Sequence, residues 1–87
     1  MAPRPVKVVI TYCAECGYEP QTLALAGALM TTFQHQVSAI EIIPGFEGSF
    51  EVRVGDQLVH SMYRDGGFPE DQTIIDAVRA HLVTPAV

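Results

Sequence analysis

The spacing of hydrophobic residues changes several times along the chain, and each change predicts a secondary-structure element. β-Branched residues over positions 6–12 predict a first strand. Pro20 suits the first turn of a helix, and apolar residues then recur at helical spacing through about residue 34. The residues of this helix expected to face the core are Leu23, Ala26, Leu29, Met30 and Phe33. Positions 37–43 predict a second strand, which Pro44 and Gly45 end.

A hairpin is the clearest local prediction. Positions 49–54 alternate strictly between polar and apolar residues, Gly55-Asp56 forms a two-residue turn, and positions 57–63 return antiparallel. The expected cross-strand pairs are Val54–Gln57, Val52–Val59 and Glu51–His60. Val59 would then join the core, and His60 would lie beside Glu51 on an exposed face. That face would carry Glu51, Arg53, Leu58, His60 and Met62.

The last predicted element is a helix over residues 70–82. It follows the segment Gly-Gly-Phe-Pro at 66–69, which interrupts regular secondary structure. Its apolar stripe consists of Ile74, Ile75, Val78 and Leu82. The order βαβββα predicts a right-handed parallel crossover followed by an antiparallel hairpin. The expected architecture is a two-layer α/β sandwich with both helices on one face of a four-stranded mixed sheet. One domain over residues 1–87 is expected at this length.

Charge and length exclude several function classes. The net charge is -5, and the five basic residues are scattered, so nucleic acid is not an expected partner. The longest apolar run, residues 23–30, is far shorter than the ~20 residues that span a bilayer, and the N-terminal residues do not resemble a secretory signal. We therefore expect a cytoplasmic protein. In a reducing compartment, a close cysteine pair is more often catalytic or metal-binding than a structural crosslink.

The candidate chemistry lies at Cys13 and Cys16, between the first strand and the first helix. A CxxC spacing lets the two sulfurs close a small ring that can open again without unfolding the protein. The N-terminus of the following helix favours thiolate over thiol, and thiolate is the attacking species in disulfide exchange. Glu15 and Glu19 oppose this effect, so we expect the thiols to be less acidic than those of a strongly oxidising disulfide catalyst.

Two sequence blocks resemble the selenoprotein W family, which is also called Rdx. The first is residues 12–20, YCAECGYEP; the second comprises GSFEV at 48–52, the Gly55-Asp56 turn, Ser61 and DGGFP at 65–69. The resemblance extends from about residue 6 to residue 82. It implies a thioredoxin-like fold and a thiol-based redox role, with glutathione, peroxide or protein thiols as reactants. Some members of the family are associated with 14-3-3 adaptor proteins.

The resemblance also concerns the order of attack. General thioredoxin logic would make Cys13 the nucleophile, but relatives that contain selenocysteine have it at the position of Cys16. The resemblance therefore implies that Cys16 attacks and that Cys13 resolves. Two positions depart from the family or from thioredoxins. Met62 replaces a basic residue found in many relatives, and Pro44 is not an obvious equivalent of the thioredoxin cis-proline.

Two alternatives to a redox catalyst remain open. One is a copper or zinc carrier, because soft thiolates select Cu(I). Copper chaperones, however, run βαββαβ, and His35, His60 and His81 are too scattered to complete a zinc site, so no metal site and no cofactor are expected. The other alternative is a redox-sensing module without turnover, which binds a protein partner through the open sheet face near Leu58 and Met62.

Overall fold

The structure is a computed structural model and describes residues 6–83. Its elements in chain order are β1 (Val6–Cys13), α1 (Glu19–Phe33), the 3₁₀ turn η1 (Gln34–Gln36), β2 (Val37–Gly45), β3 (Phe50–Val54), β4 (Gln57–Ser61), α2 (Met62–Asp65) and α3 (Asp71–Val83). The predicted strands and both predicted helices are present. The short helix α2 was not predicted; it takes the place of the expected end of the fourth strand.

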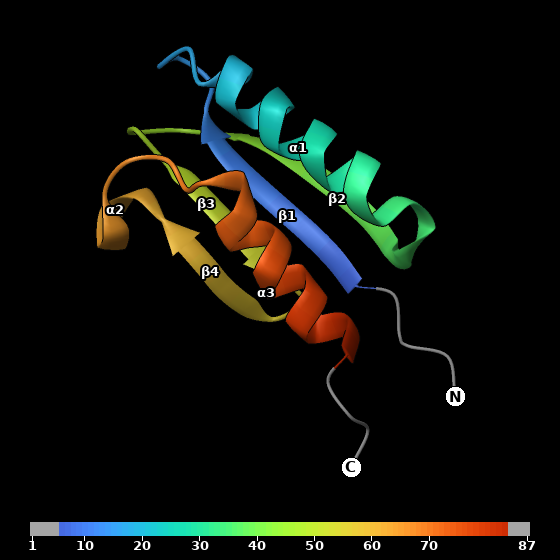
Figure 1. The fold of residues 1–87 in the computed structure, drawn as a ribbon. Coiled ribbons are helices and arrows are strands. Elements are labelled where there is room, and N and C mark those ends of the chain that lie inside the picture. Colours follow the sequence, from blue (N-terminus) through green and yellow to red (C-terminus); the bar gives the residue numbers. More distant parts are fainter. Residues whose placement is uncertain (1–5, 84–87) are drawn as a thin grey trace.

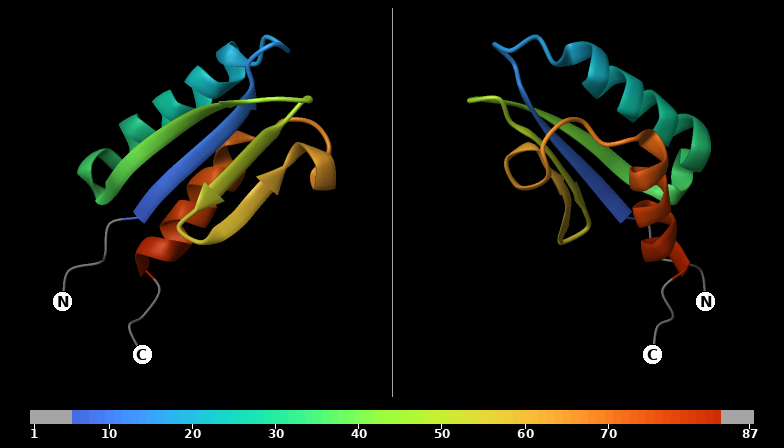
Figure 2. Two further views of the ribbon diagram at one scale, coloured as in Figure 1. Left: turned by 180° about the vertical axis from the view of Figure 1, so that it is seen from behind. Right: turned by 60° about the vertical axis from the view of Figure 1, so that its left-hand side comes forward.

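One four-stranded sheet with the order β2-β1-β3-β4 forms the centre of the molecule (Figure 1). β1 runs parallel to β2 and antiparallel to β3, and β3 pairs antiparallel with β4. Helices α1 and α3 cover the same face, and the view from behind in Figure 2 shows the strands in front of both. The predicted two-layer α/β sandwich with a mixed sheet is confirmed.

The core lies between the sheet and these two helices. Alternate residues of the central strands point into it, because side chains along a strand alternate between the two faces of the sheet. The fully buried apolar residues include Val8, Ile10, Leu29, Phe50, Val52, Val54, Ile74 and Val78. Burying each such side chain contributes roughly 1.5–3 kcal/mol. This packing fixes the end of β1 relative to the start of α1, and the candidate site lies between them.

The predicted buried face of α1 was partly wrong. Leu23 and Met30 are 65% and 58% exposed, whereas Thr22 and Leu25 are buried. Ala26, Leu29 and Phe33 are buried as expected. Residues 23–30 are apolar or small on every side of the helix, so their spacing does not select one face. The packing of α1 on the sheet decides which side is buried.

The predicted register of the hairpin was wrong beyond its first residues. Val54 pairs with Gln57 as expected, but a β-bulge follows, and Val52 pairs with His60 instead of Val59. The extra residue in β4 reverses which side each later residue faces. His60 is therefore buried, at 7% exposure, and is not the exposed partner of Glu51 that the sequence predicted. Val59 is only partly buried, at the edge of the core.

Candidate redox site

Cys13 and Cys16 lie where the sequence predicted them, between the end of β1 and the start of α1. Cys13 is the last residue of β1, and Cys16 belongs to the turn before Glu19, where α1 begins. The structure joins the two cysteines in a disulfide, with their Cα atoms 5.3 Å apart. The bond closes a loop with a sequence separation of 3, so it constrains only this turn. Opening the disulfide therefore leaves the sheet and helices connected as before.

The two cysteines differ sharply in exposure. Cys13 is completely buried, whereas Cys16 lies on the surface. Disulfide exchange requires the attacking thiolate to reach a sulfur atom, so access decides which sulfur reacts with a partner. In this structure the accessible residue is Cys16. This difference accompanies their places in the fold, because Cys13 ends the central strand β1 between β2 and β3, whereas Cys16 lies in the exposed turn.

The loop at residues 46–49 holds Cys13 through backbone hydrogen bonds. The Cys13 N–H donates to the Ser49 carbonyl at 2.8 Å, and the Ala14 N–H donates to the Gly45 carbonyl at 3.2 Å. Gly45 lies directly opposite Cys13 in the β1–β2 ladder. A Cβ on Gly45 would lie 2.8 Å from Thr11 Cγ2, so only glycine allows this close approach. The sequence predicted that Pro44 and Gly45 end the second strand, whereas β2 extends through Gly45.

The N-terminus of α1 follows directly after Cys16. Tyr18 is the N-cap residue and its side chain makes no capping hydrogen bond, while proline occupies the first turn. Thr22 Oγ1 donates to the Tyr18 carbonyl at 2.9 Å, which fixes the start of the helix. Glu19 adds a carboxylate to the first turn, where it interacts favourably with the helix dipole.

Three aromatic rings connect this turn to the loop before α3. The Phe68 ring meets the Tyr18 ring edge-on, with centroids 4.8 Å apart, and the Phe50 ring in the same manner at 5.0 Å. Such edge contacts contribute roughly 0.5–1.5 kcal/mol each beyond area burial. Phe68 therefore links the turn that carries Cys16 to the buried Phe50 on β3. These ring contacts place Phe68 against the CxxC turn.

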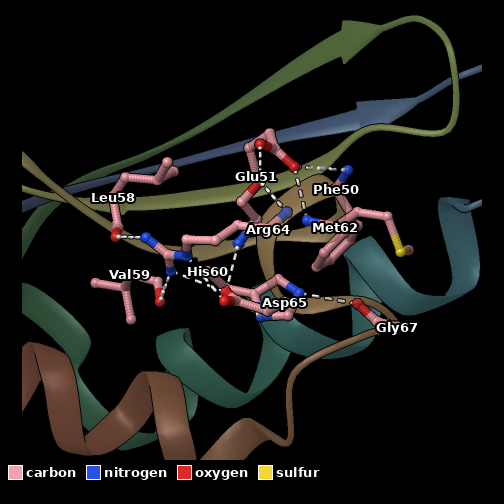
Figure 3. A network of polar contacts seen from close by, with 10 residues as sticks. Phe50, Glu51, Leu58, Val59, His60, Met62, Arg64, Asp65 and Gly67 are labelled. Carbon is pink, nitrogen blue, oxygen red and sulfur yellow. Dashed lines mark hydrogen bonds and ion pairs between the residues drawn. The ribbon is translucent and has the colours of Figure 1, made fainter.

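The loop that carries Phe68 is held in turn by His60. His60 Nε2 lies 2.9 Å from the Gly67 carbonyl, which can only accept, so this nitrogen carries a proton. The other ring nitrogen lies 3.6 Å from Asp65 Oδ2. Figure 3 shows His60 between Gly67 and Asp65, below Glu51 and Arg64. Because of the bulge in β4, His60 points inward, toward this loop.

Arg64 and Asp65 form the centre of the polar network in Figure 3. Arg64 Nε and Nη2 each donate to Asp65 at 2.8 Å, and the guanidinium also donates to the carbonyls of Leu58 and Val59 at the bulge. The Arg64 hydrogen bonds and a backbone hydrogen bond from Ser61 hold the pKa of Asp65 well below its usual value. The same carboxylate raises the pKa of Arg64.

Glu51 ties the start of α2 to β3. Its carboxylate accepts from Ser61 Oγ at 2.6 Å, from the Met62 N–H at 2.9 Å and from the Phe50 N–H at 3.3 Å. Met62 is therefore part of α2 and partly buried against the core, and does not extend the open sheet face as predicted. The sequence predicted His60 as the exposed cross-strand partner of Glu51, whereas Glu51 pairs with Ser61 and His60 is buried. Only the tertiary fold brings them to these partners.

The other two histidines, His35 and His81, belong to helical segments. His35 lies exposed in η1, and His81 Nδ1 lies 3.4 Å from the Ala77 carbonyl in α3. Over residues 6–83 there is no group of three or more His, Cys, Asp or Glu residues able to hold a metal ion. Within the same residues, no helix is long and apolar enough to cross a membrane.

The fold and the cysteine pair together define the class of the protein. A CxxC disulfide between the first strand and first helix of this mixed sheet is the arrangement of thioredoxin-like redox proteins. Residues 7–80 match the Rdx family, and the chain belongs to that family. The resemblance to selenoprotein W found in the sequence is confirmed.

Known relatives agree with this assignment. Migration and invasion enhancer 1 from Bos taurus is 39% identical over 85% of this chain, and the chain spans 63% of the length of that relative. Selenoprotein W from Gallus gallus is 34% identical over 90% of this chain and 98% of its own length. A protein from Bordetella parapertussis has a similar crystal structure, with a TM-score of 0.85 and 29% identity over 91% of this chain and 100% of that one. The selenoprotein W-related protein from Vibrio cholerae has the same fold, with a TM-score of 0.86 and 24% identity over 91% of this chain and 99% of that one.

Proposed function

We propose that this protein exchanges thiols and disulfides through Cys13 and Cys16, with Cys16 as the sulfur that reacts with the partner. The observation that carries this proposal is the unequal burial of the pair, in which Cys13 is fully buried and Cys16 is exposed. An external thiol or disulfide therefore meets Cys16 first. The family resemblance to selenocysteine-containing relatives supports the same order.

The reaction proceeds in two exchange steps. In the oxidising direction, a partner thiolate attacks Cys16 Sγ, the internal S–S bond breaks, and Cys13 leaves as a thiolate that takes up a proton. A second partner thiolate then attacks the partner sulfur of the mixed disulfide, which releases reduced Cys16 and an oxidised partner. Two electrons pass from the partner to the protein. In the reverse direction, the Cys16 thiolate attacks a partner disulfide and Cys13 resolves the mixed disulfide.

Glutathione, protein thiols and peroxide are the reactant classes that suit this pair. With peroxide, the Cys16 thiolate would become a sulfenic acid, and Cys13 would condense with it to form the disulfide and water. A cytoplasmic location fits this chemistry because reductants there reopen the disulfide. Glu15 and Glu19 lie beside the pair, so the expectation of thiols without strong acidification applies to both cysteines.

A redox titration tests the proposal. Purified protein is equilibrated in metal-free thiol/disulfide buffers, alkylated, and weighed intact to count free thiols. We expect one reversible two-electron transition with a midpoint between about -180 and -280 mV, the range of cellular thiol oxidoreductases. Two thiols that never close on each other would contradict the proposal. Thiols protected from alkylation until a chelator is added would favour a metal carrier instead.

A further inference from the structure

We propose that the surface around Cys16 docks a cationic polypeptide segment that contains a cysteine, and that it disfavours glutathione. This inference rests on the function proposed above and specifies its substrate class. Two features of the described residues carry it. Acidic residues belong to each of three segments that meet at the CxxC turn, and two exposed aromatic residues belong to or contact the loop that bonds this turn.

Acidic residues belong to three segments that meet at the CxxC turn. Glu15 and Glu19 belong to the turn and the first turn of α1, and both are exposed. Glu47 lies between Gly45 and Ser49, whose carbonyls accept hydrogen bonds from the Ala14 and Cys13 N–H groups. Glu70 and Asp71 follow closely after Phe68, which contacts Tyr18 beside Cys16. We call these residues the acidic rim: Glu15, Glu19, Glu47, Glu70 and Asp71.

The basic residues of the described chain do not offset the acidic rim. The charge of Arg64 is neutralised by the paired hydrogen bonds with Asp65. Lys7 forms an ion pair with Glu41 at 3.2 Å. It lies near the start of β1, six residues before Cys13, which corresponds to about 20 Å at 3.3 Å per residue. Arg53 is opposite Val9 in the sheet.

Arg79 also lies far from Cys16. Its guanidinium sits over the ring of Phe33, 5.8 Å from the ring centroid, at the end of α1 remote from the disulfide. At 3.3 Å per residue, the position of Arg53 opposite Val9 is about 13 Å from Cys13 along β1, and Lys7 and Arg79 lie near the remote ends of β1 and α1. These separations exceed the screening length of about 8 Å at physiological ionic strength. A molecule that approaches Cys16 therefore experiences a negative local potential.

Two exposed aromatic residues provide an apolar contact beside this rim. Phe46 is 74% exposed and Tyr63 is 64% exposed. Phe46 follows Gly45, whose carbonyl accepts the Ala14 N–H in the CxxC turn. Tyr63 Oη donates to the Glu47 carbonyl at 2.8 Å, so α2 holds this loop in place. Large aromatic side chains in fixed positions are typical anchors of protein interfaces.

The acidic rim discriminates by charge between glutathione and the thiols of polypeptides. Glutathione has two carboxylates and one ammonium group at neutral pH, so its net charge is negative and the acidic rim repels it. A cysteine flanked by Lys or Arg is attracted instead, and neighbouring apolar residues can contact Phe46. The peptide thiolate attacks Cys16 Sγ, the internal S–S bond breaks, and Cys13 leaves as a thiolate that takes up a proton. A second peptide thiolate releases the oxidised peptide and completes the two-electron exchange.

The test measures how fast matched thiols reduce the disulfide of the whole protein. The thiols are the N-acetylated amides of Lys-Cys-Lys, Gly-Cys-Gly and Glu-Cys-Glu, together with glutathione, and each rate is divided by the measured thiolate concentration. At low ionic strength we expect the cationic peptide to react at least about tenfold faster than the anionic peptide and glutathione, because electrostatic steering changes association rates by 10–10³. The difference should shrink strongly in 0.5 M salt, where the screening length falls to about 4 Å.

Charge variants separate docking from general effects on the cysteines. Glu15→Gln and Glu47→Gln should each reduce the ratio of the cationic to the anionic rate. The control Asp56→Asn removes the same charge in the β3–β4 turn, whose Gly55 bonds the Lys7 carbonyl at the other end of the sheet, and should leave the ratio unchanged. A change in cysteine acidity alone would alter all rates equally and leave the ratio as it was.

Phe46→Ala tests the apolar contact with a Lys-Cys-Leu-Lys peptide. We expect at least a threefold lower rate, while Met30→Ala, an equally apolar exposed change at the far end of α1, has no effect. Equal rates for cationic and anionic thiols at low salt would overturn the docking proposal and leave the proposed function intact. A disulfide that none of the thiols reduces would overturn both.

Discussion

Truncating Phe68 should loosen the turn that carries Cys16. The Phe68 ring is 39% exposed, so more than half of its surface is buried, against Tyr18 and Phe50. Phe68→Ala loses two edge contacts of roughly 0.5–1.5 kcal/mol each, together with part of the transfer energy of the ring. We expect the free energy of unfolding to fall by about 2–3 kcal/mol, below the roughly 3–5 kcal/mol typical of a fully buried phenylalanine.

Urea denaturation of the oxidised protein measures this loss, with unfolding followed by circular dichroism. Phe68→Leu keeps much of the apolar burial and loses the ring contacts, so we expect an intermediate loss of about 1 kcal/mol. Phe46→Ala is the matched control, because Phe46 is 74% exposed and its removal should cost less than about 0.5 kcal/mol. Amide hydrogen exchange should show faster opening of the CxxC turn in Phe68→Ala than in the Phe46→Ala control.

The prediction fails if the free energy of unfolding of Phe68→Ala is within about 0.5 kcal/mol of the wild-type value, the usual range for surface substitutions. It also fails if Phe46→Ala destabilises the protein as much as Phe68→Ala. A stability loss without faster exchange near Cys16 would show that Phe68 supports the core but does not hold the site. The aromatic link between Tyr18 and Phe50 would then have no part in positioning the disulfide.

Two further predictions concern the residues around the site. The lowered pKa of Asp65 means that the unfolded chain binds its proton more readily, so the contribution of Asp65 is complete above its usual pKa of 3.8 and is lost as the pH falls below that value. Asp65→Asn should therefore flatten the acid dependence of the urea midpoint, and an unchanged slope would contradict the Arg64–Asp65 pairing. Gly45→Ala places a Cβ 2.8 Å from Thr11 Cγ2 and 2.9 Å from Ser49 Oγ, and should destabilise the protein by about 1–3 kcal/mol. A thermal melt equal to that of the wild type would rule out this close approach.

The parts of the fold that depend on local pattern were predictable. The alternation from Phe50 to Val54, the Gly55-Asp56 turn and the β-branched first strand each specify their element without reference to the rest of the chain. Their order then leaves few topologies, because a parallel crossover is nearly always right-handed. The position of Cys13 and Cys16 between β1 and α1 followed from the same order.

The errors occurred where tertiary packing decides. Leu23 and Met30 lie on a helix that is apolar or small on every side, so only docking on the sheet shows that they are exposed. The bulge in β4 has no marker in the sequence, such as a glycine, and it turned His60 inward. The carbonyls of Leu58 and Val59 at this bulge accept hydrogen bonds from Arg64, which comes from the unpredicted helix α2.

The difference in burial between the two cysteines was also beyond the sequence. Neither spacing nor composition distinguishes Cys13 from Cys16, and only the family resemblance favoured Cys16. The structure supplies a physical reason, because Cys13 ends the central strand β1, where the Ser49 carbonyl accepts its N–H, whereas Cys16 lies in the exposed turn. The buried Ser49 hydroxyl has no hydrogen-bond partner in the described part of the protein, and the sequence pattern did not predict its burial.

Trapping a mixed disulfide on single-cysteine variants tests the central claim most directly. Reduced Cys13→Ser and Cys16→Ser are each mixed with a small aromatic disulfide, and intact mass follows adduct formation over time. The account predicts rapid formation of a stable adduct on Cys13→Ser and at least about tenfold slower reaction of Cys16→Ser, because the remaining Cys13 is buried and access limits exchange. Circular dichroism of both variants confirms that they are folded. Faster reaction at Cys13 would contradict the assignment of Cys16 as the reacting sulfur.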